Sequence, residues 1–128
     1  MKSFYGSLLI VLLVASCIAA GFSTPAPSDL MKKKTVHAQN ILKYLALGDL
    51  KNVRSEADSL DRLMAESGFE EKPGRYAEYG REFLKLVKEL SAEAGNGNLA
   101  GSYYRFTRMT SVCFSCHEHI RDASAGGK

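Results

Sequence analysis

Cys113, Cys116 and His117 lie within five consecutive residues, Cys113-Phe114-Ser115-Cys116-His117, and their types and spacing indicate a specific chemistry. Two cysteines separated by two residues, with histidine directly after the second, form the attachment signature of c-type haem. Each thiol would add to one vinyl group of the porphyrin, and the histidine can reach the iron from the same face. The run therefore predicts one covalently attached haem c, with thioethers at Cys113 and Cys116 and with His117 as the proximal iron ligand.

Two other chemistries use these residue types. A structural zinc site needs four ligands, and the further candidates nearby are Glu118 and His119, neither of which shares a helical face with His117. A redox-active dithiol is expected beside a βαβ pattern, which the sequence does not contain. Haem attachment is the favoured interpretation, and it requires an exported chain with enough helix to enclose a flat apolar cofactor.

The first 20 residues have the composition of an export signal. Lys2 precedes the apolar run Leu8–Ala15, and small residues follow, which is the order found in signal peptides. This run is shorter than the roughly 20 apolar residues of a membrane span. We expect a signal peptide over residues 1–20, cleaved either at its end or before Cys17. The second alternative follows from the lipobox-like run Val14-Ala15-Ser16-Cys17, in which a lipid on Cys17 would tether the protein to a membrane. Both alternatives predict a periplasmic or otherwise exported protein.

Composition excludes several classes of function. The 128 residues fit one domain, and 17 Lys and Arg against 14 Asp and Glu give a formal charge of +3, so no nucleic-acid partner is expected. The basic run Lys32-Lys33-Lys34 is interpreted as a solvated helix face. Three cysteines, one of them in the leader, do not make a disulfide scaffold. Because the chain lacks a nucleophile–base pattern, we do not expect an enzyme.

The body of the chain predicts an all-α fold. Four apolar stripes with helical spacing end at glycines, and no segment alternates with a period of two. The first expected helix is Leu30–Leu47 with Asp29 as N-cap, and the second has Asp49 as N-cap and runs to about Ser67. The third is Arg75–Ala94, and the fourth runs from near Asn98 to about Arg121. Short glycine-containing turns favour an antiparallel up-down-up-down four-helix bundle over residues 29–122. A linker at 21–28 would precede it and a disordered tail at 123–128 would follow.

Helical phase indicates which side chains face the expected haem. In the last helix the inward stripe is predicted to be Tyr103, Phe106, Thr110, Cys113 and His117. In the first helix Met31 lies about 30° from the centre of the apolar stripe and His37 about 90° from it, at 100° per residue.

Met31 is therefore either the distal iron ligand or an apolar residue on the distal face. His37 is at the margin and is expected at the surface. Met64 and Met109 are expected in the core, and His119 is expected to be exposed.

The motif, the predicted bundle and the export signal together resemble the cytochrome c prime family, including its six-coordinate, methionine-ligated relatives. The resemblance is most specific at Gly97–Ala100 and Ser111–Arg121. It implies that Arg121 lies near the haem, and that Met31 falls close to the family position facing the distal side of the iron. It also implies a homodimer through the first two helices in parts of the family. The loops around Gly48 and at Phe69–Gly74 are shorter than the family pattern.

The sequence thus predicts an exported monohaem c-type cytochrome that carries single electrons between redox partner proteins. Met31 and His117 as the two axial ligands would raise the reduction potential relative to two histidines. An alternative is a five-coordinate haem that binds NO or another small gas, with Met31 packed above the iron. A third is a structural or assembly module in which haem mainly holds the bundle together.

Overall fold

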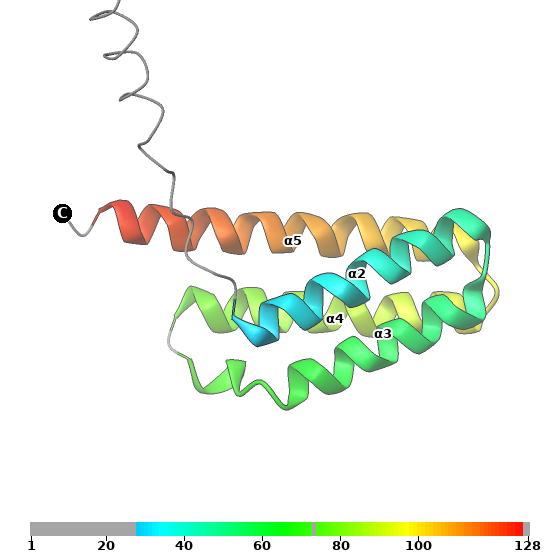
Figure 1. Ribbon diagram of the computed structural model, residues 1–128, viewed down its shortest axis with the longest axis horizontal. Helices are drawn as coiled ribbons and strands as arrows, with labels where there is room; N and C mark the ends of the chain where they lie inside the picture. The colour runs from blue at the N-terminus through cyan, green and yellow to red at the C-terminus, as the bar shows by residue number, and fades with distance from the viewer. Residues whose placement is uncertain (1–27, 73, 127–128) are drawn as a thin grey trace, which may run out of the picture.

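Four α-helices and one short 3-10 helix form the described part of the chain, in a computed structural model that describes residues 28–72 and 74–126 (Figure 1). They are α2 (Asp29–Leu47), α3 (Leu50–Ala65), η1 (Phe69–Glu71), α4 (Arg75–Gly95) and α5 (Leu99–Ala125). No strand occurs in these residues, so the all-α prediction is confirmed. The predicted signal peptide, Cys17 and most of the linker lie outside the described residues. Between Ser28 and Gly126, no helix is both long and apolar enough to cross a membrane.

Local hydrogen bonds explain where the helices begin. Asp49 caps α3 as predicted, because its Oδ1 accepts the N–H of Asn52 at 3.1 Å. The hydrogen bonds from the Asn52 side chain and backbone hold the pKa of Asp49 below its usual value. The cap predicted for α2 was wrong: Ser28 Oγ accepts the N–H of Met31 at 3.3 Å. Asp29 is already helical, in the first turn where a carboxylate favours the helix dipole.

The helix ends also differ slightly from prediction. Gly48 ends α2 in a left-handed conformation with φ 69°, as its type predicts. Helix α3 stops at Ala65, two residues before the predicted end, and α5 continues through Ala125. The tail predicted to be disordered from residue 123 is therefore helical as far as Ala125.

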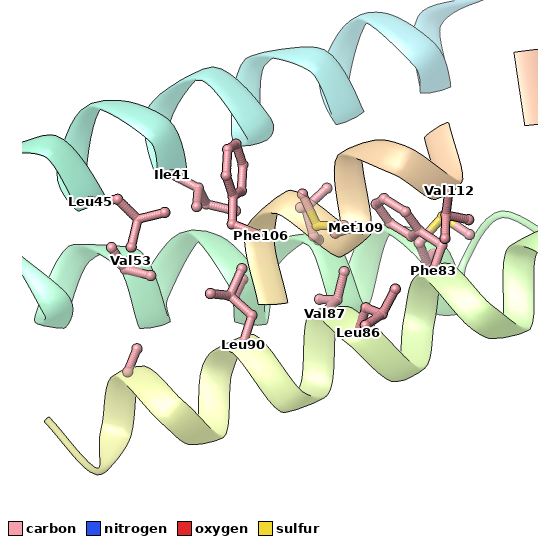
Figure 2. Close-up of a cluster of buried hydrophobic side chains, with 14 of the residues drawn as sticks. Ile41, Leu45, Val53, Phe83, Leu86, Val87, Leu90, Phe106, Met109 and Val112 are labelled. Carbon is pink, nitrogen blue, oxygen red and sulfur yellow. The ribbon is translucent and has the colours of Figure 1, made fainter. Parts of the chain in front are cut away.

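A continuous apolar core joins the four helices. Helix α4 packs against both α3 and α5, α2 packs against α3, and α2 touches α5 more lightly. In Figure 2, Leu45 and Val53 lie at one end of the drawn cluster, and Phe83 and Val112 lie at the other. The apolar stripe of α4 belongs to this core, with Phe83, Leu86, Val87 and Leu90 all buried.

The inward face of α5 is rotated relative to the prediction. Its buried residues are Ser102, Phe106, Met109 and Val112, whereas Tyr103 is 57% exposed and Thr110 is also exposed. The predicted stripe was wrong at these two positions, and its last member, His117, is exposed as well. The apolar Met109 and Val112 turn inward instead, while Tyr103 and Thr110 stay at the surface, where the Thr110 hydroxyl donates to the Thr107 carbonyl at 2.8 Å.

The connection between α3 and α4 contributes to the core, although the sequence predicted only a turn. Phe69 in η1 is 4% exposed and its ring lies against Gly80 of α4. A Cβ atom at Gly80 would overlap the Phe69 ring. The absence of a side chain at Gly80 therefore allows η1 to close this end of the core.

Replacing Gly80 by alanine tests this packing. A helical Gly→Ala change ordinarily stabilises a protein by roughly 0.5–1 kcal/mol. Here the new methyl must displace a buried ring, so we expect Gly80→Ala to lower the free energy of unfolding by about 1–3 kcal/mol, measured by urea denaturation. Gly95→Ala is the control, because its Cβ would meet mainly the flexible end of the Arg54 side chain. Equal effects of the two substitutions would contradict the proposed contact.

Candidate functional site

The three motif residues lie just past the middle of α5. Cys113 and Cys116 are half-buried and are not in a disulfide, while His117 is exposed. Positions separated by three and four residues lie on one face of a helix. All three side chains consequently line the same hollow.

That hollow lies where η1 and all four helices meet, with α3 contributing Met64. It encloses about 450 Å³, including space open to solvent, and its walls are mainly apolar and aromatic. Its lining residues are Met31, Lys34, Met64, Phe69, Tyr76, Tyr79, Gly80, Phe83, Val112, Cys113, Cys116 and His117. An aromatic wall with a few convergent polar groups is typical of cofactor sites.

A second hollow continues from the first between α2 and α5. It encloses about 720 Å³, again including open space, and Ala38, Leu42 and Phe106 extend its apolar wall. Five residues line both hollows: Met31, Lys34, Phe83, Cys113 and His117. Together the two hollows form one apolar groove that has the motif on its α5 side.

Met31 of α2 lines both hollows together with Cys113 and His117 of α5. The structure therefore brings together the two residues for which the sequence predicted axial positions, Met31 and His117, although whether either binds iron stays a prediction. Met64 and Met109 are buried, at 3% and 0% exposed, as predicted. Met64 also lines the first hollow, which the sequence did not indicate.

Lys34 is a site residue that the sequence analysis missed. Lys32 and Lys33 are exposed as expected, but Lys34 is half-buried and lines both hollows. Its Nζ lies 4.3 Å from the centroid of the Phe83 ring, within the range of a cation–π interaction. The prediction that all three lysines of this run face solvent was therefore wrong for Lys34. Residues three apart share a helical face, so the inward phase predicted for Met31 could have indicated that Lys34 also faces inward.

Burial changes the acid–base properties of these groups. Loss of solvation lowers the pKa of Lys34, while the nearby thiols of Cys113 and Cys116 act in the opposite direction. Burial raises the pKa of Cys113 and of Cys116, and the positive charge of Lys34 partly offsets both changes. The two thiols are therefore less readily ionised than in water.

The other histidines are held outside the groove lining. His37 Nδ1 lies 2.6 Å from Glu56 Oε2, and Asn40 Nδ2 donates to Glu56 Oε1 at 3.2 Å. These contacts join α2 to α3 at a half-buried position, so the surface position predicted for His37 was wrong. His119 was predicted to be exposed, but it is half-buried with its ring centroid 6.0 Å from that of Tyr79. An imidazole ring that packs on an aromatic ring in this way loses part of its contact with water.

Arg121 lies on the outer side of α5 and lines neither hollow. Its guanidinium carbon is 5.9 Å from the centroid of the Phe114 ring, and Phe114 is 62% exposed. The proximity of Arg121 to a haem stays a prediction from the family resemblance.

Comparison with protein families, with curated proteins and with solved structures gave no match to this chain. The argument for function therefore depends on the residues and geometry of the groove.

The altered thiol pKa values can be tested on reduced protein that carries no haem. Since the thiolate is the reactive form and burial raises the pKa of both cysteines, alkylation by iodoacetamide should reach half its maximal rate at a higher pH than for free cysteine. Lys34→Leu removes the charge that favours the thiolate, so it should move this midpoint higher still. Lys33→Leu, at an exposed position, should leave it unchanged. If the pH of half-maximal alkylation equals that of free cysteine, the conclusion that burial raises the pKa of the two thiols is wrong.

Proposed function

We propose that this chain is an exported monohaem c-type cytochrome that carries single electrons between redox partner proteins. The observation that supports this function best is the position of Cys113, Cys116 and His117 together on one wall of an aromatic groove. The attachment motif predicts covalent haem c, and the groove offers the apolar surroundings that such a ring requires. Met31 of α2, which lines the same hollow, offers a thioether sulfur.

The residues of the groove fit a haem in their chemistry. Two thiols can form thioethers with the vinyl groups, each S–H adding across one C=C bond without an oxidant. His117 offers an imidazole nitrogen for the iron, and Met31 offers a sulfur atom for the other side. When bound, haem supplies one-electron chemistry that no side chain here can perform.

The protein's own contribution to electron transfer would be to hold these groups in place and to exclude water. Phe83 and Val112 belong to the buried core and also line the groove, so the pocket wall is supported by packed side chains. Phe69, fixed against Gly80, closes the first hollow at the η1 end. A rigid apolar pocket keeps the surroundings of the cofactor similar in both oxidation states.

The proposed architecture is an antiparallel up-down-up-down bundle with covalent haem near the C-terminus. Two connections support it: Gly48 and Asp49 alone separate α2 from α3, and only Asn96–Asn98 separate α4 from α5. Such short links favour neighbouring helices that run in opposite directions. Membership of the cytochrome c prime family, export to the periplasm, a homodimer through α2 and α3, and a tether at Cys17 belong to the same proposal.

A five-coordinate haem that binds NO or another small gas is the second candidate. The second hollow favours it, because open space reaches Met31 and His117 from between α2 and α5. In that case Met31 would pack above the iron without binding it.

Covalent attachment is the first test. Expressed with its signal peptide in a host that matures c-type cytochromes, the protein should gain the mass of one haem and keep it after denaturation. Cys113→Ser with Cys116→Ser should abolish covalent retention, since no thioether can form. Ser115→Ala, which changes the spacer and leaves both thiols, is the control. A wild-type protein that folds in this host without haem would exclude the proposed function.

The distal ligand is tested by Met31→Ala. If Met31 binds the iron, the oxidised wild-type protein should be low-spin with the weak far-red band of an iron–sulfur(Met) bond, and the substitution should convert it to high-spin. Met64→Leu is the control, because Met64 lines the same hollow and the substitution preserves its volume. A wild-type protein that is already high-spin, and whose spectrum changes with NO, would favour the gas-binding alternative.

A further inference from the structure

We propose that Lys34 places a positive charge in the haem pocket and thereby raises the reduction potential of the iron. This inference rests on the proposed function, and it assigns a role to a residue that the attachment motif does not include. Lys34 would act on the iron through its positive charge alone and would form no bond to it.

The geometry of α2 brings the amine into the pocket. Lys34 follows Met31 by three residues, so both side chains leave the same face of the helix, and both line the two hollows. The Nζ atom lies 4.3 Å from the Phe83 centroid. Phe83 is itself 4% exposed and belongs to the core. A packed aromatic face therefore holds the ammonium on the inner side of α2.

The charge has no carboxylate beside it in the groove. Among the described residues that line the two hollows there is no Asp or Glu, and Lys34 is the one Lys or Arg. Charges in partly buried surroundings interact more strongly than charges in water and are screened less by salt. An ammonium at this place should influence a charge in the pocket more than an exposed lysine does.

The sign of the effect follows from the electron count. With haem bound, one electron from a donor protein would reduce the iron from ferric to ferrous, with no bond formed or broken. The ferric site carries one more positive charge than the ferrous site, so the nearby ammonium destabilises the oxidised form. Removing the ammonium should therefore make reduction less favourable.

The test compares Lys34→Leu with Lys33→Leu in the haem-loaded protein. The two substitutions each remove one positive charge, and the two positions are adjacent in the chain. Lys33, however, is exposed and lines neither hollow. We expect Lys34→Leu to shift the one-electron equilibrium at least tenfold toward the oxidised form, which is about 59 mV. Lys33→Leu should shift it less than threefold. Spectroelectrochemical titration at low and at physiological salt gives the midpoint potential, and the spectra show that the axial ligands are unchanged.

Two further variants keep the result interpretable. Lys34→Arg retains a cation that stacks on aromatic rings and should restore a potential close to that of the wild type. If Lys34→Leu does not retain haem, Lys34→Gln makes the same comparison with an uncharged polar side chain.

The inference would be overturned if Lys33→Leu and Lys34→Leu shifted the midpoint potential equally, or if Lys34→Leu raised it; the cytochrome proposal would still stand. Equal shifts are also the result expected if a haem propionate neutralises the Lys34 ammonium. A wild-type chain that folds without haem would overturn both proposals, so the two failures are distinguishable.

Discussion

The contact of α4 with both α3 and α5 is the interaction on which the rest of the structure depends, and Phe83 lies where this contact meets the candidate site. Its ring is buried in the core, lines both hollows and faces the Lys34 amine. Burying a phenylalanine side chain contributes about 1.5–3 kcal/mol, so the residue that supports the fold also forms a wall of the groove. The core and the candidate pocket are continuous, and a change in the packing of one will alter the other.

Contacts with α3 hold helix α2 in place more than contacts with α5 do. It touches α5 lightly, whereas Ile41 is fully buried in the core and the Glu56 carboxylate of α3 contacts both His37 and Asn40. Hydrogen bonds to a charged group contribute more than neutral ones, about 1.5–3 kcal/mol. Since Met31 and Lys34 are carried by the same helix, the interactions of α2 with α3 help to determine where these two side chains lie relative to the motif.

Much of this arrangement was predictable because short-range patterns determine it. Gly48 and Asp49 mark a helix end and a helix start by conformation and hydrogen bonding alone, and the spacing of Cys113, Cys116 and His117 specifies one helix face. The wrong N-cap of α2 was a local error, since Ser28 and Asp29 are neighbours that can both cap a helix. Two other mispredicted positions, Phe69 and Lys34, depend on long-range packing. Phe69 is buried because Gly80, eleven residues later, leaves space for its ring. Lys34 turns inward because an aromatic face is available on α4, and its residue type indicated the opposite.

The two residues that α2 directs into the groove have consistent chemical effects in the proposed cytochrome. A methionine sulfur as the second axial ligand favours ferrous iron, and a cation close to the pocket favours the state with less positive charge. Neither effect requires the other, because one acts through a bond and one through space. Their combination would give a high-potential haem, which accepts an electron from weak donors and releases it only to a stronger oxidant. A site that served chiefly to bind a gas would need an open iron coordination position, and a bound Met31 would occupy it. The identity of the sixth ligand therefore distinguishes the two functions, while the Lys34 charge would favour ferrous iron in either.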